Sequence, residues 1–102
     1  MLIQKGGSVY IVTNARHTVL YTGVTSDLHN RIREHKDKVY PNSFTAKYNC
    51  GILVWYETYP QISEAIDREK QIKAGNRASK IDLINALNPE WKDLWETDVR
   101  YW

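Results

Sequence analysis

The order of apolar and polar residues near the start of the chain predicts a β-hairpin. A β-rich run, a polar turn and a second strand-like run follow one another at residues 8–13, 14–17 and 18–24. This alternation is typical of two antiparallel strands joined by a short turn. With the turn centred on Ala15 and Arg16, we expect Tyr10 directly opposite Tyr21, with both hydroxyls on one face of the sheet. Gly23, near the end of the second strand, would let a ligand approach the backbone closely.

A helix is predicted directly after the hairpin, over about residues 26–37. Thr25 or Ser26 can cap it, because their side chains accept hydrogen bonds from the first turn. Arg31 and His35 are four residues apart, so we expect them to project side by side from this helix. Further along, the pattern predicts a polar loop with one helical turn and then a third strand, at residues 39–50, 45–47 and 51–59.

A carboxylate stands on the apolar stripe of the next predicted helix. Ser63 can cap this helix and Gly75 can end it, and its inward residues are expected to be Ala65, Ile66 and Ile72. Glu69 lies midway between the last two of these, on the face meant for burial. An unpaired buried carboxylate is costly, so we expect Glu69 to meet a cation, a metal or a water-filled cleft.

The C-terminal part is predicted to be helical. Residues 77–87 form one expected helix, with Ile81, Ile84 and Leu87 facing inward. Asn88 and Pro89 are interpreted as the N-cap and first residue of another helix, which carries Trp91, Leu94 and Trp95 at helical spacing. We interpret these tryptophans as packing residues, because aromatic residues at helical spacing are usually structural.

Length and composition indicate one small domain. With 102 residues, 42% of them hydrophobic, the chain can bury one modest core. We expect a single domain over residues 1–102, with its core at about 8–80 and a helical extension at 81–102. No apolar run resembles a signal peptide or a membrane span, so we expect a cytoplasmic protein that does not enter the membrane. The single cysteine, Cys50, excludes an internal disulfide and is expected to pack in the core.

The charge is small in total but uneven along the chain. The net charge is +2, yet residues 1–80 hold 12 Lys/Arg against 7 Asp/Glu, and residues 81–102 hold 2 against 5. Clustered cations suit a polyanionic partner. The candidate nucleic-acid contacts are Arg33, Lys36, Lys38, Lys70, Lys73, Arg77 and Lys80. Charge alone favours the alternative that these are simply solvated helix faces.

Four short motifs stand in a recognisable order. They are Ser8-Val9-Tyr10, Tyr21-Thr22-Gly23, the Arg31 and His35 pair, and Glu69 within residues 68–73. In order and spacing they resemble the GIY-YIG nuclease superfamily, which includes homing endonucleases and the catalytic domain of the bacterial excision-repair incision subunit. The resemblance covers roughly residues 8–80. It implies an α+β fold, a small three-stranded antiparallel sheet flanked by helices, that hydrolyses a DNA phosphodiester with one divalent ion, Mg²⁺ or Mn²⁺.

The resemblance also implies a role for each motif residue. Tyr10 and Tyr21 line the site, and Arg31 contacts the scissile phosphate, for which a planar guanidinium is well suited. His35 supports the positioning of water or phosphate. Glu69 ligates the metal, and one carboxylate suffices because Mg²⁺ keeps most of its water. The family favours Tyr10 as general base, whereas ordinary pKa values favour His35, and both stay open.

One position differs from the excision-repair members of that superfamily, and the match of another is left open. Val24 stands where the excision-repair enzymes carry a lysine, which excludes a lysine-assisted mechanism at that position. Some members add a downstream asparagine to the site, and Asn76 and Asn88 are both candidates for it, although the capping interpretation of Asn88 is preferred.

Together these features predict a metal-dependent DNA endonuclease with a role in DNA repair or processing. We expect no separate targeting domain, so specificity is predicted to be low, to depend on DNA structure, or to come from a targeting protein partner. One alternative is a nucleic-acid-binding module that keeps the fold without turnover. Another is a protein-interaction domain that uses the aromatic C-terminus, Trp91, Trp95, Tyr101 and Trp102. RNA stays open as a substrate in place of DNA.

Overall fold

Three strands and a set of short helices form the domain. The computed structural model describes residues 6–102, so the first five residues of the expected domain lie outside it. The elements are β1 (Gly7–Thr13), β2 (Leu20–Thr25), α1 (Leu28–Asp37), α2 (Phe44–Lys47), β3 (Ile52–Tyr59), α3 (Ile62–Ala74), α4 (Arg77–Leu87), α5 (Leu94–Thr97) and the 3₁₀ helix η1 (Val99–Tyr101). β1 is central and pairs antiparallel with β2 and β3. The predicted α+β fold with a three-stranded antiparallel sheet is confirmed. Across residues 6–102, no helix has the length and apolar character that crossing a membrane requires.

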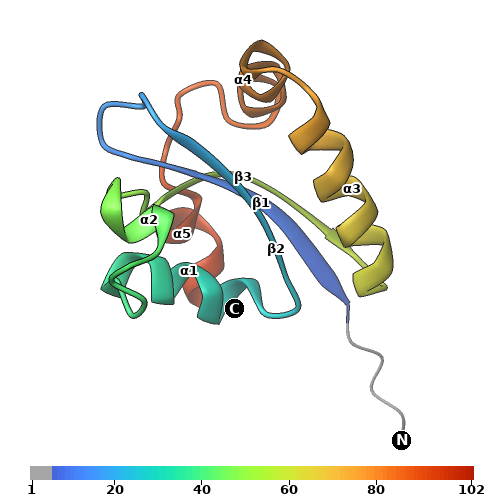
Figure 1. Ribbon diagram of the computed structural model, residues 1–102. Coiled ribbons are helices and arrows are strands. Elements are labelled where there is room, and N and C mark those ends of the chain that lie inside the picture. The colour runs from blue at the N-terminus through green and yellow to red at the C-terminus, as the bar shows by residue number, and fades with distance from the viewer. Residues whose placement is uncertain (1–5) are drawn as a thin grey trace, which may run out of the picture.

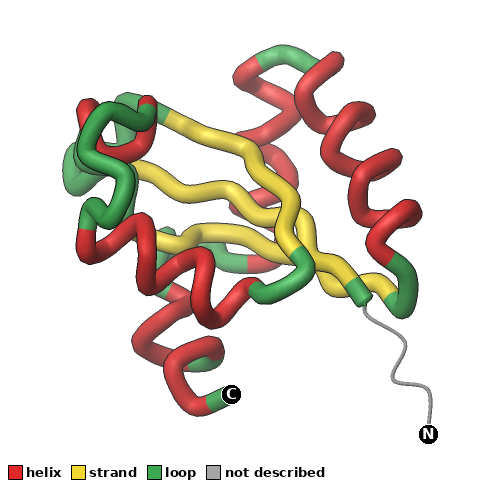
Figure 2. The backbone as a smooth tube through the Cα atoms, turned by 60° about the horizontal axis from the view of Figure 1, so that its bottom comes forward, coloured by secondary structure: helices red, strands yellow, loops and turns green. Residues whose placement is uncertain are grey.

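Helices cover both faces of the sheet (Figure 1 and Figure 2). α3 and α4 lie on one face, where the core includes Val9 and Ile11 of β1. α1 and the C-terminal segment lie on the other face, where the core includes Tyr10 and Val12. Successive strand residues point to opposite faces, so covering both faces buries every residue of β1. Cys50 is buried in the core on the α1 face, as predicted.

The β1–β2 register differs from the predicted one. Tyr10 pairs with Gly23, and Tyr21 pairs with Val12, two residues further along β1. The cause is the turn, in which Asn14 Oδ1 accepts hydrogen bonds from the backbone N–H groups of Thr18 and Val19, just before β2, and the centre of the turn lies one residue further along. Because side chains alternate with a period of two, this shift keeps both tyrosines on one face. Their ring centroids are 6.5 Å apart.

Three predictions about the helices are wrong in detail. Asp27 caps α1 in place of Thr25 or Ser26, because its carboxylate accepts a hydrogen bond from the first turn. Ser63 lies inside α3, which begins one residue earlier, so it is not the cap. Ile66, expected to face inward, is 37% exposed, because it lies on the solvent side of α3.

The segment after α4 folds differently from the prediction. Asn88 ends α4 instead of starting a helix, because its side chain bonds the backbone of Val54 and Lys92. Trp91 has a φ of 54°, in the left-handed region, which is incompatible with the predicted helix. Leu87, expected to face inward, is exposed. Leu87 therefore lies on the solvent side of α4, whereas Ile84, in the same turn, is completely buried in the core as predicted.

The C-terminal aromatic residues divide into two groups. Trp91 and Trp95 pack against the two core clusters, which fits the interpretation of packing residues. Tyr101 and Trp102 are exposed. Val99 is completely buried beside α1, so the segment beyond residue 80 contributes to the same core.

Candidate active site

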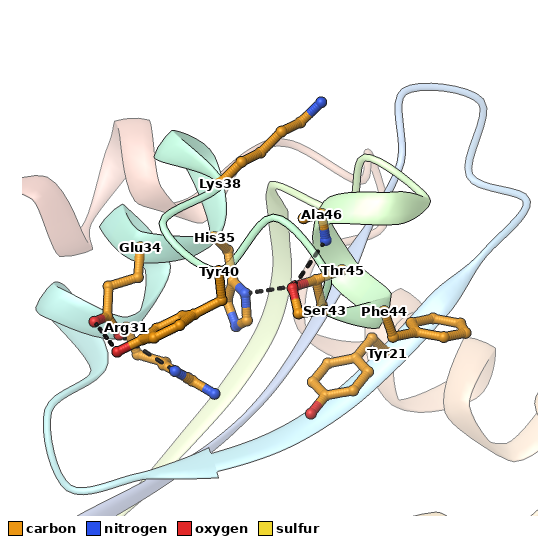
Figure 3. Close-up of a pocket in the computed structure, with 10 residues that line it drawn as sticks. All are labelled: Tyr21, Arg31, Glu34, His35, Lys38, Tyr40, Ser43, Phe44, Thr45 and Ala46. Carbon is orange, nitrogen blue, oxygen red and sulfur yellow. Dashed lines mark hydrogen bonds and ion pairs between the residues drawn. The ribbon is translucent and has the colours of Figure 1, made fainter.

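A small pocket opens between α1, β2 and the segment that contains α2 (Figure 3). Its volume is about 110 Å³. Tyr21, Arg31 and His35 line it, so three of the predicted site residues meet there. Figure 3 shows the Arg31 guanidinium and the Tyr21 hydroxyl directed toward the same side of the pocket. Phe44 stands beside Tyr21, and the two rings stack with centroids 5.9 Å apart.

Tyr10 lies behind this pocket and is connected to it through His35. The Tyr10 hydroxyl is 2.8 Å from His35 Nε2, and His35 Nδ1 is 2.9 Å from Thr45 Oγ1. Tyr10 is only 1% exposed and does not line the pocket itself. His35 therefore links a buried phenol to the pocket, with both ring nitrogens engaged in hydrogen bonds.

Gly23 provides the space for the Tyr10 ring. The two residues are directly paired, and a Cβ on Gly23 would collide with the ring and hydroxyl of Tyr10. The backbone of Gly23 has no positive φ, so the glycine is required for space and not for backbone freedom. The sequence predicted close approach of a ligand here, but the group that approaches is a side chain of the site.

The two buried groups of the site have strongly shifted pKa values. Burial raises the pKa of Tyr10 to about 12, although the nearby Arg31 acts to lower it. Burial lowers the pKa of His35 to about 4, and the positive charge of Arg31 adds to this effect while Glu34 opposes it. Both side chains are therefore neutral at pH 7. Neither has the pKa near 7 that suits a general base acting alone.

Arg31 is held in the pocket by two residues that the sequence did not reveal as part of the site. Its guanidinium lies 3.3 Å from the Glu34 carboxylate and 5.8 Å from the centre of the Tyr40 ring. The Tyr40 hydroxyl also donates to Glu34, at 3.3 Å. The spacing of three residues between Arg31 and Glu34 on one helix is the signal that could have identified this pair. The role of Tyr40 depends on the fold of the loop and has no such signal.

Glu69 lies around the edge of β2 from this pocket and does not line it. Its carboxylate is 3.3 Å from the Lys73 ammonium, and that ammonium lies 6.0 Å from the centre of the Tyr21 ring. The side chain of Glu69 is 16% exposed, and its negative charge contributes to the raised pKa of Tyr10. The half-buried carboxylate predicted from the sequence thus meets a cation and stands near the tyrosines.

Comparison with known proteins identifies the family of the chain. Residues 6–82 match the GIY-YIG catalytic domain. The chain belongs to the GIY-YIG family. The nuclease family predicted from the motifs is thereby confirmed, and the departure at Val24 does not exclude the chain from it.

Relatives of this GIY-YIG protein occur in bacteria and archaea. A UPF0213 protein of Syntrophus aciditrophicus is 38% identical over 82 residues, which cover 80% of this chain and 92% of the relative. The UPF0213 protein HQ_3675A of Haloquadratum walsbyi is 38% identical over 79 residues, covering 74% and 82%. The NMR structure of the UPF0213 protein BH0048 from Bacillus halodurans matches with a TM-score of 0.56 at 23% identity, over 92% of this chain and 98% of that one. This structural match shows the shared fold, and the name UPF0213 specifies no activity.

Val24, Asn76 and Asn88 lie outside the pocket. Val24 packs against the core on the α3 face. Asn76 caps α4 by accepting from the Ser79 N–H, and Asn88 closes the same helix. Neither asparagine lines the pocket, and each stands at one end of α4.

The basic residues predicted to contact nucleic acid differ in whether they bond other groups of the protein or line a pocket. The Lys36 ammonium is 2.5 Å from Asp93 and 2.8 Å from the Gly51 carbonyl, so it is held by two groups of the protein itself. Arg33 pairs with Asp37, Lys38 bonds Asn49, and Arg77 donates to the His17 carbonyl. Lys70 is exposed on α3. Lys73 and Lys80 line a second pocket beside β2.

Proposed function

We propose that this GIY-YIG protein is a metal-dependent endonuclease that hydrolyses phosphodiester bonds in DNA. The observation that carries the proposal is the pocket in which Tyr21, Arg31 and His35 meet, with the Tyr10 hydroxyl bonded to His35. A volume of about 110 Å³ suits a phosphate group and a water molecule better than a whole nucleotide. Membership of a nuclease family supports this class of reaction. A role in DNA repair or processing, and targeting by a partner protein, stay predictions.

Arg31 is the residue that we assign to the scissile phosphate. Its planar guanidinium can donate to two phosphate oxygens at once, which neutralises charge where it develops during hydrolysis. In the unbound protein Glu34 pairs with this guanidinium at 3.3 Å. An entering phosphate would compete with Glu34, while Tyr40 would still hold the side chain over the pocket.

Tyr10 and His35 are proposed to activate water as a pair. When Nδ1–H of His35 donates to Thr45, Nε2 accepts a hydrogen bond from the Tyr10 hydroxyl. A water that reaches the Tyr10 hydroxyl can give its proton to the phenol oxygen as the phenol passes its own proton to His35 Nε2, so that hydroxide forms, the phenol stays neutral and the imidazole becomes positively charged. The positive charge of Arg31 lowers the pKa of His35. A bound phosphate would offset this charge, so the proton transfer to His35 would become more favourable.

Glu69 is the residue that would hold the metal ion. No group of three His, Cys, Asp or Glu side chains with metal-binding geometry occurs in the part of the chain that the structure describes, so water would supply the other ligands. Mg²⁺ and Mn²⁺ accept such coordination by one carboxylate and several waters. The partly exposed Glu69 carboxylate fits this role once Lys73, which is 49% exposed, turns away. The ion would supply positive charge to the phosphate and to the leaving oxygen.

Nicking of supercoiled plasmid DNA with Mg²⁺ or Mn²⁺ tests the proposal. The wild-type protein is expected to nick, and Glu69→Gln is expected to lose nicking with either metal. Tyr10→Phe is expected to lower the rate by about 10²–10⁴-fold, the usual contribution of general acid–base catalysis. Glu64→Gln is the matched control, because Glu64 is an exposed carboxylate on the same helix.

Two results would contradict the proposal. Nicking that survives Glu69→Gln would indicate a contaminating nuclease. Salt-dependent DNA binding without cleavage, with both metals, would favour the non-catalytic nucleic-acid-binding module.

A further inference from the structure

A second pocket lies beside the first, around the edge of β2. Its volume is about 320 Å³, and it is lined by Leu20, Tyr21, Thr22, Phe44, Lys73 and Lys80. Tyr21 and Phe44 line both pockets. Because β2 is an edge strand, this pocket receives side chains from both faces of the sheet. A ligand in it would be the immediate neighbour of a phosphate held by Arg31.

Phe44 gives this pocket an exposed aromatic surface. Phe44 is the first residue of the one-turn helix α2 and is 48% exposed. The stack with Tyr21, with planes 29° apart, and a contact with Tyr48, with centroids 4.7 Å apart, hold the ring in place. Supported aromatic rings at a surface are the platforms on which nucleobases stack in proteins that bind single-stranded nucleic acid.

Cations and an unsatisfied hydroxyl complete the pocket. Lys73 and Lys80 reach it from α3 and α4, and Lys73 also pairs with Glu69. Thr22 is only 5% exposed, and its Oγ1 has no hydrogen-bond partner among residues 6–102. A buried polar atom without a partner is uncommon in folded proteins. Thr22 belongs to the pocket wall, but Oγ1 itself is covered, so a rotation of the side chain about its Cα–Cβ bond would have to turn the hydroxyl toward a ligand that supplies the missing partner.

We propose that this pocket binds one unstacked nucleobase of the DNA strand whose phosphate occupies the first pocket. The proposal rests on the endonuclease function proposed above. The base stacks on Phe44 and meets the Thr22 hydroxyl, and the adjoining backbone phosphate lies against Lys73 and Lys80. Tyr21, shared by both pockets, separates the base from the scissile phosphate.

This arrangement defines the class of DNA substrate. In a duplex each base is covered by its neighbours, so an aromatic side chain can stack only on a base in a single strand or on one turned out of the helix. The protein is therefore expected to prefer single-stranded or unpaired DNA over a fully paired duplex.

Binding without divalent metal tests the base pocket separately from cleavage. The probes are labelled oligothymidylate, an abasic strand of the same length and a blunt duplex, followed by fluorescence anisotropy. Phe44→Leu is expected to weaken oligothymidylate binding by about 5- to 150-fold, the range for one stacked base, and to leave the abasic strand unchanged. Phe44→Trp is expected to keep the affinity. Tyr101→Leu, an exposed aromatic outside both pockets, is the matched control.

Thr22→Val supplies a second variant that keeps the shape of the side chain. Because Thr22 Oγ1 bonds no described residue, this variant is expected to keep its stability while it loses affinity for oligothymidylate. Equal binding of both single strands by the wild type, or equal weakening of both by Phe44→Leu, would overturn the proposal. Plasmid nicking without base-dependent binding would overturn the base-binding proposal and leave the proposed endonuclease function standing. Base-dependent binding without nicking would overturn the proposed endonuclease function and support the base-binding pocket.

Discussion

Gly23 sets the position of the Tyr10 phenol, so its substitution is expected to be costly. In Gly23→Ala the new methyl group would overlap the ring and hydroxyl of Tyr10. Overpacking of this kind destabilises a core by about 1–3 kcal/mol, and here it would also displace the phenol from His35. Urea denaturation measures the free energy of unfolding, and plasmid nicking measures the effect on the site.

Gly51→Ala is the matched control for that prediction. A Cβ at Gly51 would meet only Lys36, at ordinary van der Waals distances of 3.6 and 3.7 Å. Its free energy of unfolding is expected to change by less than about 0.5 kcal/mol. Equal losses in the two variants would show that the Tyr10 contact is not the cause.

The titration of His35 is expected to make the protein less stable in mild acid. The pKa of His35 is about 4 in the folded protein, below the value of about 6.5 expected for the unfolded chain. Between these values the unfolded chain binds more protons than the folded one, so stability falls as the pH is lowered through this range. NMR titration of the His35 ring should give a midpoint near 4. A midpoint near 6.5 would contradict the prediction, and His35→Gln should lack this part of the pH dependence.

The sequence predicted part of the site at the level of single residues. Tyr21, Arg31 and His35 meet because a strand and a helix of regular geometry carry them at fixed spacing. The burial of Tyr10 depends on a register that the Asn14 turn sets, and the contribution of Phe44 depends on the fold of the loop before β3. Such long-range contacts leave no periodic pattern in the sequence.

Helices and strands with a regular local pattern were also predicted better than segments that depend on long-range contacts. The strands, α3 and α4 were predicted within a few residues, because their apolar periodicity is strong and Gly75 marks the end of α3. The segment after α4 was not, because Asn88-Pro89 is as compatible with a helix start as with a helix end. The bond from the Asn88 side chain to the Val54 carbonyl, 34 residues away, decides between them.

Asp93 joins the C-terminal segment to the rest of the fold, so Asp93→Ala is expected to destabilise the protein by about 2–4 kcal/mol. The carboxylate accepts from the backbone N–H groups of Leu53 and Trp95 and pairs with Lys36. Removing it leaves two backbone donors and a half-buried ammonium without this partner. Thermal and urea denaturation measure the loss.

Glu96→Ala is the control for Asp93→Ala. Glu96 also pairs with a cation, Arg100, but both side chains of that pair are about half exposed. Exposed pairs of this kind contribute about 0–1 kcal/mol. A loss for Glu96→Ala as large as that for Asp93→Ala would show that the buried contacts of Asp93 are not decisive.

At the scale of the whole molecule, the candidate site spans the edge strand β2. The pocket with Arg31 and His35 lies on the α1 side, whereas Glu69 and Lys73 come from α3 on the other side. Tyr21 touches both groups through the shared wall of the two pockets and the Lys73 contact. An edge strand permits this arrangement, because no neighbouring strand blocks passage from one face of the sheet to the other. Sequence order alone did not indicate that the site would extend around this edge.

A salt titration of DNA binding is expected to distinguish lysines that bind DNA phosphates from lysines that stabilise the fold. Each lysine that neutralises one phosphate adds about 0.7 to the slope of log affinity against log salt for a single strand, and about 0.9 for a duplex. Lys80→Gln is expected to lower the slope by about this amount with little change in stability, since Lys80 lines the second pocket. Lys36→Gln is expected to keep the slope and to lower the free energy of unfolding, because its ammonium binds Asp93 and the Gly51 carbonyl. If Lys36→Gln lowers the slope as much as Lys80→Gln, the separation of structural from DNA-binding lysines is wrong.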